Sequence, residues 1–471
     1  MTHITLVNAV LPSNVNVPPQ GILYLTAALE AAGYEVEIRD YQLCRDPAPS
    51  TPEALARFVR GSAPIIGFSC MSYILPLICR ASALIKAERP DVRIVLGGIG
   101  PAGAGAPLLD YCPDIDATVI GEGERTIVDL VERWTGPRRD RADTAAVNGL
   151  HARIGGKVVT TPARERVRSM TQLEPPAYRR VDFSSYRLVD SQFARGCPFE
   201  CSFCDIAPYW NRRNVHRPME HYLDELEWLV GDLGARDVFI IDDTFVLSRK
   251  MVMAFCEGIL ARGLDFEWGC YARVDLIDAE LLDLMAEAGC RKVFFGIETG
   301  SDRVLQVIDK ATTVDQCART VKLALERLSF VTASFVWGFP DETMDELKDT
   351  AFFLLYLAAL GASPQLNLAL PYALSPLYRQ YRDRIVFDPD KSSQLQFYEG
   401  DRGWLCGMIA ERPDLFSVFY HYPTPDLQRK WDYLDRIGLS PHDLQRAYDH
   451  PLPAEPATPA PAAVRERGLA L

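Results

Sequence analysis

The sequence lacks the features of a secreted or membrane-inserted protein. No stretch approaches the roughly 18 consecutive apolar residues of a membrane-spanning helix, and the longest candidate, 351–360, is too short. The start, MTHITLVNAV, has no charged segment followed by a long apolar one, so we predict no signal peptide. The twelve cysteines lack disulfide-framework spacing, which is typical of a reducing compartment. We therefore expect a cytoplasmic protein that does not bind membranes.

Basic residues are scarce relative to acidic ones. The chain has 50 Lys and Arg against 63 Asp and Glu, a formal net charge of -13. Because nucleic-acid-binding proteins usually present a basic face, we expect no nucleic-acid partner. An acidic surface instead favours a cationic small molecule. At 471 residues, the chain is long enough for two or three domains with sizeable cores.

Strand-like and helix-like segments alternate five times over residues 1–135. This alternation predicts an α/β fold, a Rossmann-like domain with a doubly wound parallel sheet. The strands are expected at 4–9, 36–38, 65–70, 93–96 and 117–120. Ligands of such sheets lie beyond the carboxyl ends of the strands, where this sequence has small and polar residues.

Three further regions are expected. Residues 136–190 form a linker with a hairpin at 149–160. Residues 191–372 alternate strands with helices again, which predicts a partial (β/α)6 barrel with its catalytic groups at the carboxyl ends of the strands. Residues 373–450 are rich in aromatic side chains and are expected to form a small, mostly helical domain that caps the open side of the barrel. The Pro/Ala-rich tail, 451–471, is expected to be disordered.

Three cysteines in one short loop point to metal chemistry. Cys197, Cys201 and Cys204 follow the first barrel strand with C-x3-C-x2-C spacing, in FARGCPFECSFCDIAP. Soft thiolates favour iron–sulfur clusters, and three thiolates on a [4Fe–4S] cluster leave one iron open to another ligand. Two alternatives stay open, a zinc-binding interaction module, which needs a fourth ligand, and a non-catalytic iron–sulfur redox sensor.

This loop resembles the signature loop of the radical S-adenosylmethionine (SAM) family, with the aromatic Phe203 just before the last cysteine. In that family the open iron binds the amino and carboxylate groups of SAM. One electron then splits SAM into methionine and a 5'-deoxyadenosyl radical. The resemblance implies that Cys197, Cys201 and Cys204 are the catalytic cluster ligands and that Phe203 contacts SAM.

Segments at successive strand ends extend the resemblance. IDDTF, CYARVD, GIETGS and GFPDET are similar to segments of radical SAM enzymes that carry a cobalamin-binding domain. The resemblance implies that Asp242, Asp243 and Thr244 hold the SAM amino group. It also implies that Arg273 holds the SAM carboxylate and that Glu298 contacts the ribose or amino group. Structural roles stay open: a helix cap for Asp243, and an ion pair between Arg273 and Glu298.

The first domain resembles the cobalamin-binding domain that is fused to many radical SAM enzymes. The matching segments are PPQGILYLTAALEAAGYEVEIRD, GFSC, GG and GEGERT. The resemblance implies a cobalamin pocket at the strand ends, with the candidate residues Ser69, Ser72, Gly97, Gly98, Gly121 and Glu122. No D-x-H-x-x-G motif supplies a histidine for cobalt. The alternative is a Rossmann-like domain without cofactor, which the bulky Met71 and Tyr73 favour.

These resemblances predict an enzyme that uses a [4Fe–4S] cluster, SAM and cobalamin to abstract hydrogen from an sp3 carbon of a small metabolite. With cobalamin, the expected reaction is C-methylation in secondary metabolism. Without cobalamin, it is the radical dehydration of a cationic amino sugar, as in aminoglycoside antibiotic pathways. Tyr209, Trp210 and Tyr372 are candidate substrate contacts. An external donor such as flavodoxin or ferredoxin is expected to supply the electron.

Overall fold

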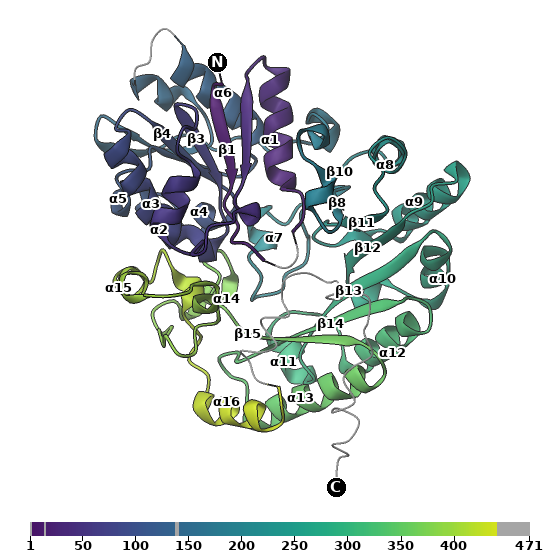
Figure 1. Ribbon diagram of the computed structural model, residues 1–471. Helices are drawn as coiled ribbons and strands as arrows, with labels where there is room; N and C mark the ends of the chain where they lie inside the picture. The colour runs from purple at the N-terminus through teal and green to yellow at the C-terminus, as the bar shows by residue number, and fades with distance from the viewer. Residues whose placement is uncertain (1, 14–15, 137–140, 440–471) are drawn as a thin grey trace.

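The computed structural model describes residues 2–13, 16–136 and 141–439. Two sheets dominate it, one in the N-terminal half and one in the C-terminal half, and the last helices lie beside both (Figure 1). The expected tail, 451–471, and the end of the expected cap, 440–450, lie outside the described residues. Among the described helices, none combines the length and apolarity needed to cross a membrane.

The N-terminal sheet has seven strands in the order β2-β1-β3-β4-β5-β6-β7. The strands are β1 Ile4–Asn8, β2 Val36–Asp40, β3 Ile65–Ser69, β4 Arg93–Gly97, β5 Ala117–Val119, β6 Leu150–Ile154 and β7 Lys157–Thr160. β1 to β5 pair in parallel, as predicted. The hairpin expected in the linker forms β6 and β7 and extends this sheet, because β6 pairs antiparallel to β5.

Helices cover both faces of this sheet, as Figure 1 shows. They are α1 Gln20–Ala31, α2 Pro52–Phe58, α3 Leu75–Glu88, α4 Ile99–Ala104, α5 Pro107–Tyr111 and α6 Glu124–Thr135. Successive residues of a strand point to opposite faces. Leu6 of β1 therefore packs with α1 and α6, and Val7 packs with α2 and α3.

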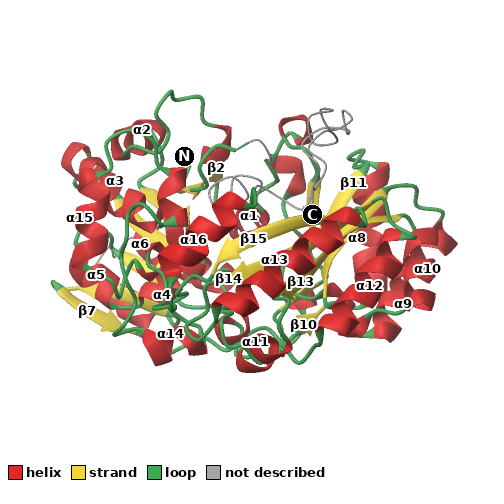
Figure 2. Ribbon diagram, turned by 90° about the horizontal axis from the view of Figure 1, so that it is seen from below, coloured by secondary structure: helices red, strands yellow, loops and turns green. Residues whose placement is uncertain are grey.

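The C-terminal sheet has six strands, all parallel, in the order β15-β14-β13-β12-β11-β8. The strands are β8 Val189–Ser191, β11 Asp237–Ile240, β12 Glu267–Ala272, β13 Cys290–Glu298, β14 Phe330–Trp337 and β15 Ser363–Leu368. Its helices are α8 Met219–Gly231, α9 Arg249–Arg262, α10 Ala279–Glu287, α11 Asp302–Val307, α12 Val314–Leu325 and α13 Met344–Ala359. Figure 2 shows these helices outside the strands, which confirms the predicted partial barrel.

A buried tyrosine joins the two halves of the molecule. The hydroxyl of Tyr178 accepts a hydrogen bond from Gln20 Nε2 at 2.9 Å and donates one to the carbonyl of Asp190 at 3.0 Å. Gln20 begins α1 of the first domain, and Asp190 lies on β8 of the second. Since Tyr178 is only 1% exposed, this link is shielded from water and fixes the two sheets relative to each other.

The C-terminal segment packs differently from our expectation. It contains α14 Pro376–Tyr381, α15 Gly403–Glu411 and α16 Leu427–Arg436. Much of it shares a core with the first domain: Tyr398 donates a hydrogen bond to the carbonyl of Tyr73 at 2.7 Å, and the rings of Tyr73 and Phe397 lie 5.0 Å apart. The aromatic residues therefore cover the α3 side of the N-terminal sheet rather than only the open side of the barrel.

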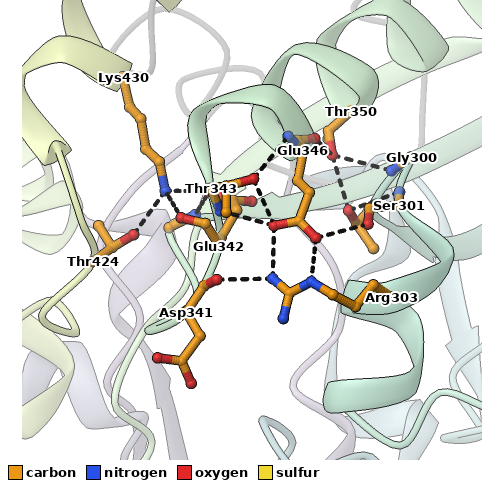
Figure 3. Close-up of polar contacts among 12 residues, drawn as sticks. Gly300, Ser301, Arg303, Asp341, Glu342, Thr343, Glu346, Thr350, Thr424 and Lys430 are labelled. Atoms are coloured by element: carbon orange, nitrogen blue, oxygen red, sulfur yellow. Dashed lines mark hydrogen bonds and ion pairs between the residues drawn. The ribbon is translucent and has the colours of Figure 1, made fainter.

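The last helix, α16, contacts the barrel through a buried lysine. Lys430 Nζ lies 3.1 Å from Glu342 Oε2, both side chains are fully buried, and Nζ also donates to Thr424 Oγ1 at 2.8 Å (Figure 3). Next to Glu342, Thr343 and Glu346 form a capping box that starts α13. The pair thereby anchors α16 at the first turn of α13.

A buried ion pair between Arg217, which precedes α8, and Glu225 of α8 supports the barrel and gives a stability test. Arg217 Nη1 lies 2.6 Å from Glu225 Oε2, with the two side chains 2% and 5% exposed. We expect R217M to lower the free energy of unfolding by about 3–5 kcal/mol, because it leaves the Glu225 carboxylate buried and unpaired. Urea denaturation measures this change.

The matched control is R262M. Arg262 on α9 pairs with three exposed carboxylates of α8, those of Glu220, Asp224 and Glu227. Exposed pairs contribute little, so this variant should unfold close to the wild-type midpoint. An equal loss of unfolding free energy in R217M and R262M would contradict the conclusion that Arg217 supports the barrel.

Candidate functional site

The three cysteines lie in the loop that follows β9 (Ala194–Arg195). The loop starts at Gly196, which has a left-handed φ of 101°. A Cβ atom here would lie 2.2 Å from the carbonyl oxygen of Arg213, so only glycine fits. Asn214 Nδ2 donates a hydrogen bond to the Gly196 carbonyl at 2.7 Å. The local sequence RGCP thus folds tightly against the segment around Arg213.

Two aspartates at the end of β11 hold the backbone that leads into this loop. Asp242 Oδ1 accepts hydrogen bonds from the amides of Phe193 at 2.8 Å and Ala194 at 2.9 Å. Asp243 Oδ2 accepts one from the amide of Gly196 at 2.6 Å. Burial raises the pKa of Asp242 to about 8 and that of Asp243 to about 6. Both carboxylates position the loop, and their contact with SAM remains a prediction.

The third residue of this set, Thr244, lies at the first cysteine. Its Oγ1 is 3.5 Å from Cys197 Sγ and donates a hydrogen bond to the carbonyl of Asp243 at 2.6 Å. The hydroxyl therefore lies between the cysteine loop and the residues that follow β11. Its contact with the SAM amino group remains a prediction.

The donor set of the loop fits an iron–sulfur cluster better than a single ion. Burial raises the pKa of Cys201 and raises that of Cys204 to about 12, so a metal must displace thiol protons when it binds. Over 2–13, 16–136 and 141–439, no three His, Cys, Asp or Glu side chains converge on a single-ion site. In a [4Fe–4S] cluster each thiolate ligates a different iron, so such convergence is not required. The zinc alternative loses support.

Arg273, at the end of β12, reaches the second cysteine. Its Nε and Nη2 lie 3.0 and 3.1 Å from the two carboxylate oxygens of Asp275. The guanidinium carbon lies 3.8 Å from the ring centroid of Phe199. Nη1 is directed at Cys201 Sγ, 3.8 Å away. The guanidinium is therefore fixed beside the cluster loop, and its contact with the SAM carboxylate remains a prediction.

Glu298, at the end of β13, is paired with a residue that the sequence analysis missed. Lys310 Nζ donates to Glu298 Oε1 at 2.6 Å, and both side chains are 8% exposed. The ion pair that we considered between Arg273 and Glu298 does not form: Arg273 pairs with Asp275, and Glu298 pairs with Lys310. No periodic pattern marks Lys310, because it lies in the irregular loop IDKAT after α11.

The aromatic SAM candidate, Phe203, lies within the cysteine loop, between Cys201 and Cys204. Phe203 is partly buried and contacts Phe339 edge to face, with ring centroids 5.8 Å apart. Phe339 follows β14 and is itself buried. An apolar contact thus joins the cysteine loop to the end of β14, and the contact of Phe203 with SAM remains a prediction.

A cavity of about 230 Å³ opens at the carboxyl ends of β3, β4 and β5. Five of the six cobalamin candidates line it, namely Ser69, Gly97, Gly98, Gly121 and Glu122. Ser72 lies outside this lining and starts the short 3-10 helix Ser72–Ile74. Leu6, Val95 and Ile127 contribute apolar side chains from two strands and α6.

The glycines of this cavity leave room for a large group. A Cβ atom on Gly97 or Gly121 would meet nothing within 4 Å, so both backbones border open space. Met71 and Tyr73 do not fill the cavity: Met71 is 49% exposed, and Tyr73 packs against Phe397. The residues therefore fit an amphipathic ligand such as cobalamin, whose nucleotide base needs an apolar pocket.

The mouth of the cavity is polar and borders the cysteine loop. Arg195 Nη1 lies 2.7 Å from Glu124 Oε1 and 3.8 Å from Glu122 Oε1, and its guanidinium lies over the ring of Tyr24 at 4.5 Å. Burial raises the pKa of Glu122. Arg195 stands two residues before Cys197, so one charged cluster connects the cavity to the loop.

The substrate candidates separate into two groups. Tyr209 and Trp210 line the same cavity as the cobalamin candidates, and the Tyr209 hydroxyl donates to the carbonyl of Gly121 at 3.3 Å. Tyr372 lies apart from them and packs against the core shared by the first domain and the C-terminal segment. Contact of any of the three with a substrate remains a prediction.

Comparisons with known proteins agree with both halves of the site. The family described as "Radical SAM superfamily" matches residues 191–354, and the "B12 binding domain" family matches residues 8–131. The anaerobic magnesium-protoporphyrin IX monomethyl ester cyclase of Rubrivivax gelatinosus is 30% identical over 437 residues, 88% of this chain and 77% of that protein. An uncharacterized methyltransferase of Pyrococcus horikoshii is 30% identical over 361 residues, 75% of this chain and 76% of that protein.

A solved structure shares the fold. It is the radical S-adenosylmethionine methyltransferase TsrM of Kitasatospora setae with tryptophan substrate and a SAM analogue bound. The TM-score is 0.69 at 22% identity, over 96% of this chain and 89% of that one. The arrangement of an N-terminal parallel sheet, a radical SAM sheet and a helical C-terminal segment is therefore a known architecture.

The cluster assignment is tested by C201A. We expect anaerobically reconstituted C201A to retain much less iron and sulfide than the wild type. The substitution leaves only two of the three thiolates to hold the [4Fe–4S] cluster. The control is C406A, since Cys406 lies on α15, outside the loop. Iron and sulfide analysis measures the difference, and SAM cleavage retained by C201A would refute the cluster role of the loop.

The cavity assignment is tested by G97V. Valine fits the open space above Gly97 without backbone strain, but its side chain takes up room that a bound corrinoid needs. A clash that costs about 1–3 kcal/mol weakens corrinoid binding by roughly tenfold. We expect weaker hydroxocobalamin binding with unchanged iron content, measured by absorption after desalting. The matched control is G407V, because Gly407 also borders open space but lies on α15. Equal corrinoid binding by G97V and wild type would place the corrinoid elsewhere.

Proposed function

This chain belongs to the radical SAM superfamily, in the branch with an N-terminal B12-binding domain, and we propose that it is a cobalamin-dependent C-methyltransferase. It is an enzyme whose cofactors are a [4Fe–4S] cluster, SAM and cobalamin, and its substrate is a small molecule. The specific reaction, transfer of a methyl group to an sp3 carbon of a small metabolite, is the proposal.

One observation carries this proposal: the cobalamin cavity borders the cysteine loop. Gly97 and Gly121 line the cavity from the first domain, and Arg195 and Tyr209 line it from the radical SAM domain. Arg195 is separated from Cys197 only by Gly196. A substrate held at this boundary would have the radical source on one side and the methyl carrier on the other, as methyl transfer to carbon requires.

The protein contributes position, charge and exclusion of water. When bound, the cluster supplies the electron that splits SAM, and cobalamin carries the methyl group. Asp242 and Asp243 hold the cluster loop, and Arg273 offers a fixed cation to the SAM carboxylate. Burial of Arg195 with Glu124 keeps water from the boundary between the two cofactor positions.

A metabolite of a secondary pathway is the substrate class that we propose. The methyltransferase relatives support methylation, and the acidic balance of the chain, -13, tolerates a cationic substrate. The competing reaction, dehydration of an amino sugar, would not use the cavity at the ends of β3, β4 and β5. A non-catalytic redox sensor would need neither the cavity nor the charged groups at the strand ends.

We propose that flavodoxin or ferredoxin supplies the electron in the cytoplasm. Arg213 is exposed, and its carbonyl contacts the backbone of Gly196 at the start of the cysteine loop. Acidic electron carriers would be attracted to such a cation close to the cluster. In the described ranges, the cysteines form no disulfide, which suits a reducing compartment.

The reaction is tested without knowledge of the substrate. The enzyme is reconstituted anaerobically with iron, sulfide and hydroxocobalamin, then incubated with SAM and a strong reductant. We expect S-adenosylhomocysteine, left when SAM methylates the bound corrinoid, together with 5'-deoxyadenosine from radical cleavage. Chromatography measures both products, and hydroxocobalamin-free enzyme is the control. 5'-Deoxyadenosine without S-adenosylhomocysteine in both preparations would favour the dehydratase reaction instead.

A further inference from the structure

The loop between α11 and α12 contacts three parts of the site at once. The carbonyl of Ile308 accepts a hydrogen bond at 2.9 Å from the amide of Ser202, which lies between the second and third cysteines. The carbonyl of Lys310 accepts one at 2.7 Å from Arg273 Nη2. The Lys310 side chain pairs with Glu298. Residues 308–310 therefore connect the cluster loop to both charged SAM candidates.

The backbone of this loop is strained so that Lys310 turns inward. Asp309 and Ala311 have left-handed φ values of 54° and 56°, and Glu298 has one of 69°. Side chains with a Cβ atom rarely adopt this conformation, and such strain concentrates at functional sites. Asp309 and Ala311 are exposed, whereas Lys310 between them is 6% exposed. The surrounding structure thus forces one lysine into the interior.

The neighbouring strand makes room for this lysine. A Cβ atom on Gly296 would lie 2.4 Å from Glu298 Oε1 and 2.9 Å from Lys310 Nζ. The pairing register of β13 with β14 shifts between Gly296 and Glu298, which directs Glu298 to the pair. A buried ion pair brings little stability compared with apolar side chains of the same size. Its presence at a strand end next to Arg273, which contacts Cys201, therefore points to a functional reason.

We propose that Lys310 is a positioning residue for SAM. Its Nζ holds Glu298 through Oε1, so that Oε2 is presented to the ammonium or ribose hydroxyl groups of SAM. Its carbonyl, together with Asp275, fixes Arg273 so that Nη1 lies beside Cys201 and meets the SAM carboxylate. This inference rests on the assignment of Arg273 and Glu298 to SAM in the proposed function.

The test is a double-mutant cycle on SAM binding, with E298Q, K310M and E298Q/K310M. SAM binding to anaerobically reconstituted, oxidised enzyme is measured by equilibrium dialysis, so neither reduction nor methyl transfer is needed. We expect K310M to raise the SAM dissociation constant about tenfold or more, as loss of a supporting residue does. Iron and sulfide content should match the wild type. In the E298Q background, K310M should change the constant by less than about twofold, because it acts through Glu298.

The matched control is D237N/K292M. Lys292, at the opposite end of β13, forms a partly exposed ion pair with Asp237 of β11. Its removal changes stability but should leave SAM affinity unchanged. If K310M fails to fold, E298Q/K310M carries the test, since it leaves no buried charge unpaired. The double variant should then bind SAM at least about tenfold more weakly than wild type.

Three results would overturn the inference. The first is a SAM dissociation constant that is unchanged in K310M or E298Q/K310M. The second is that K310M raises the constant as much in the E298Q background as in the wild type. The third is an equal loss of SAM affinity in D237N/K292M. Loss of methyl transfer in an otherwise tight SAM binder would count against the proposed reaction and not against Lys310. The two proposals therefore fail in different ways.

Discussion

The hydrogen bonds that Asp242 and Asp243 accept from the backbone amides of residues 193–196 are the constraint on which the site depends. They join the end of one strand to the loop that carries the cysteines. Burial raises the pKa of the Cys201 and Cys204 thiols, so a metal that binds in this loop must displace thiol protons. Burying two adjacent aspartates is costly unless their oxygens are hydrogen-bonded, and here the backbone amides that lead into the loop supply those hydrogen bonds.

The second determinant is the arrangement of the two sheets. Each collects small, polar or charged residues at the carboxyl ends of its strands, and the Tyr178 link fixes one sheet against the other. Residues of both halves line the cavity at the ends of β3, β4 and β5, and one of them, Arg195, stands two residues before Cys197.

Local patterns predicted the two sheets, because buried strands leave a periodic trace in the sequence, and five of the six candidate pocket residues line the cavity. The position of Lys310 could not be predicted, since it depends on left-handed residues on both sides and on space left by Gly296 across the sheet. The packing of the C-terminal segment was also missed. It depends on contacts such as that between Tyr398 and Tyr73, 325 residues apart, which no local pattern encodes.

The measurement that tests the account most directly is the cofactor content of one preparation. The protein is purified anaerobically, reconstituted with iron, sulfide and hydroxocobalamin, and desalted. The account predicts about four irons per chain, as a [4Fe–4S] cluster requires, together with roughly one tightly bound corrinoid. Iron without corrinoid would contradict the cobalamin cavity and the methyl transfer built on it. Corrinoid without iron would contradict the role of the cysteine loop.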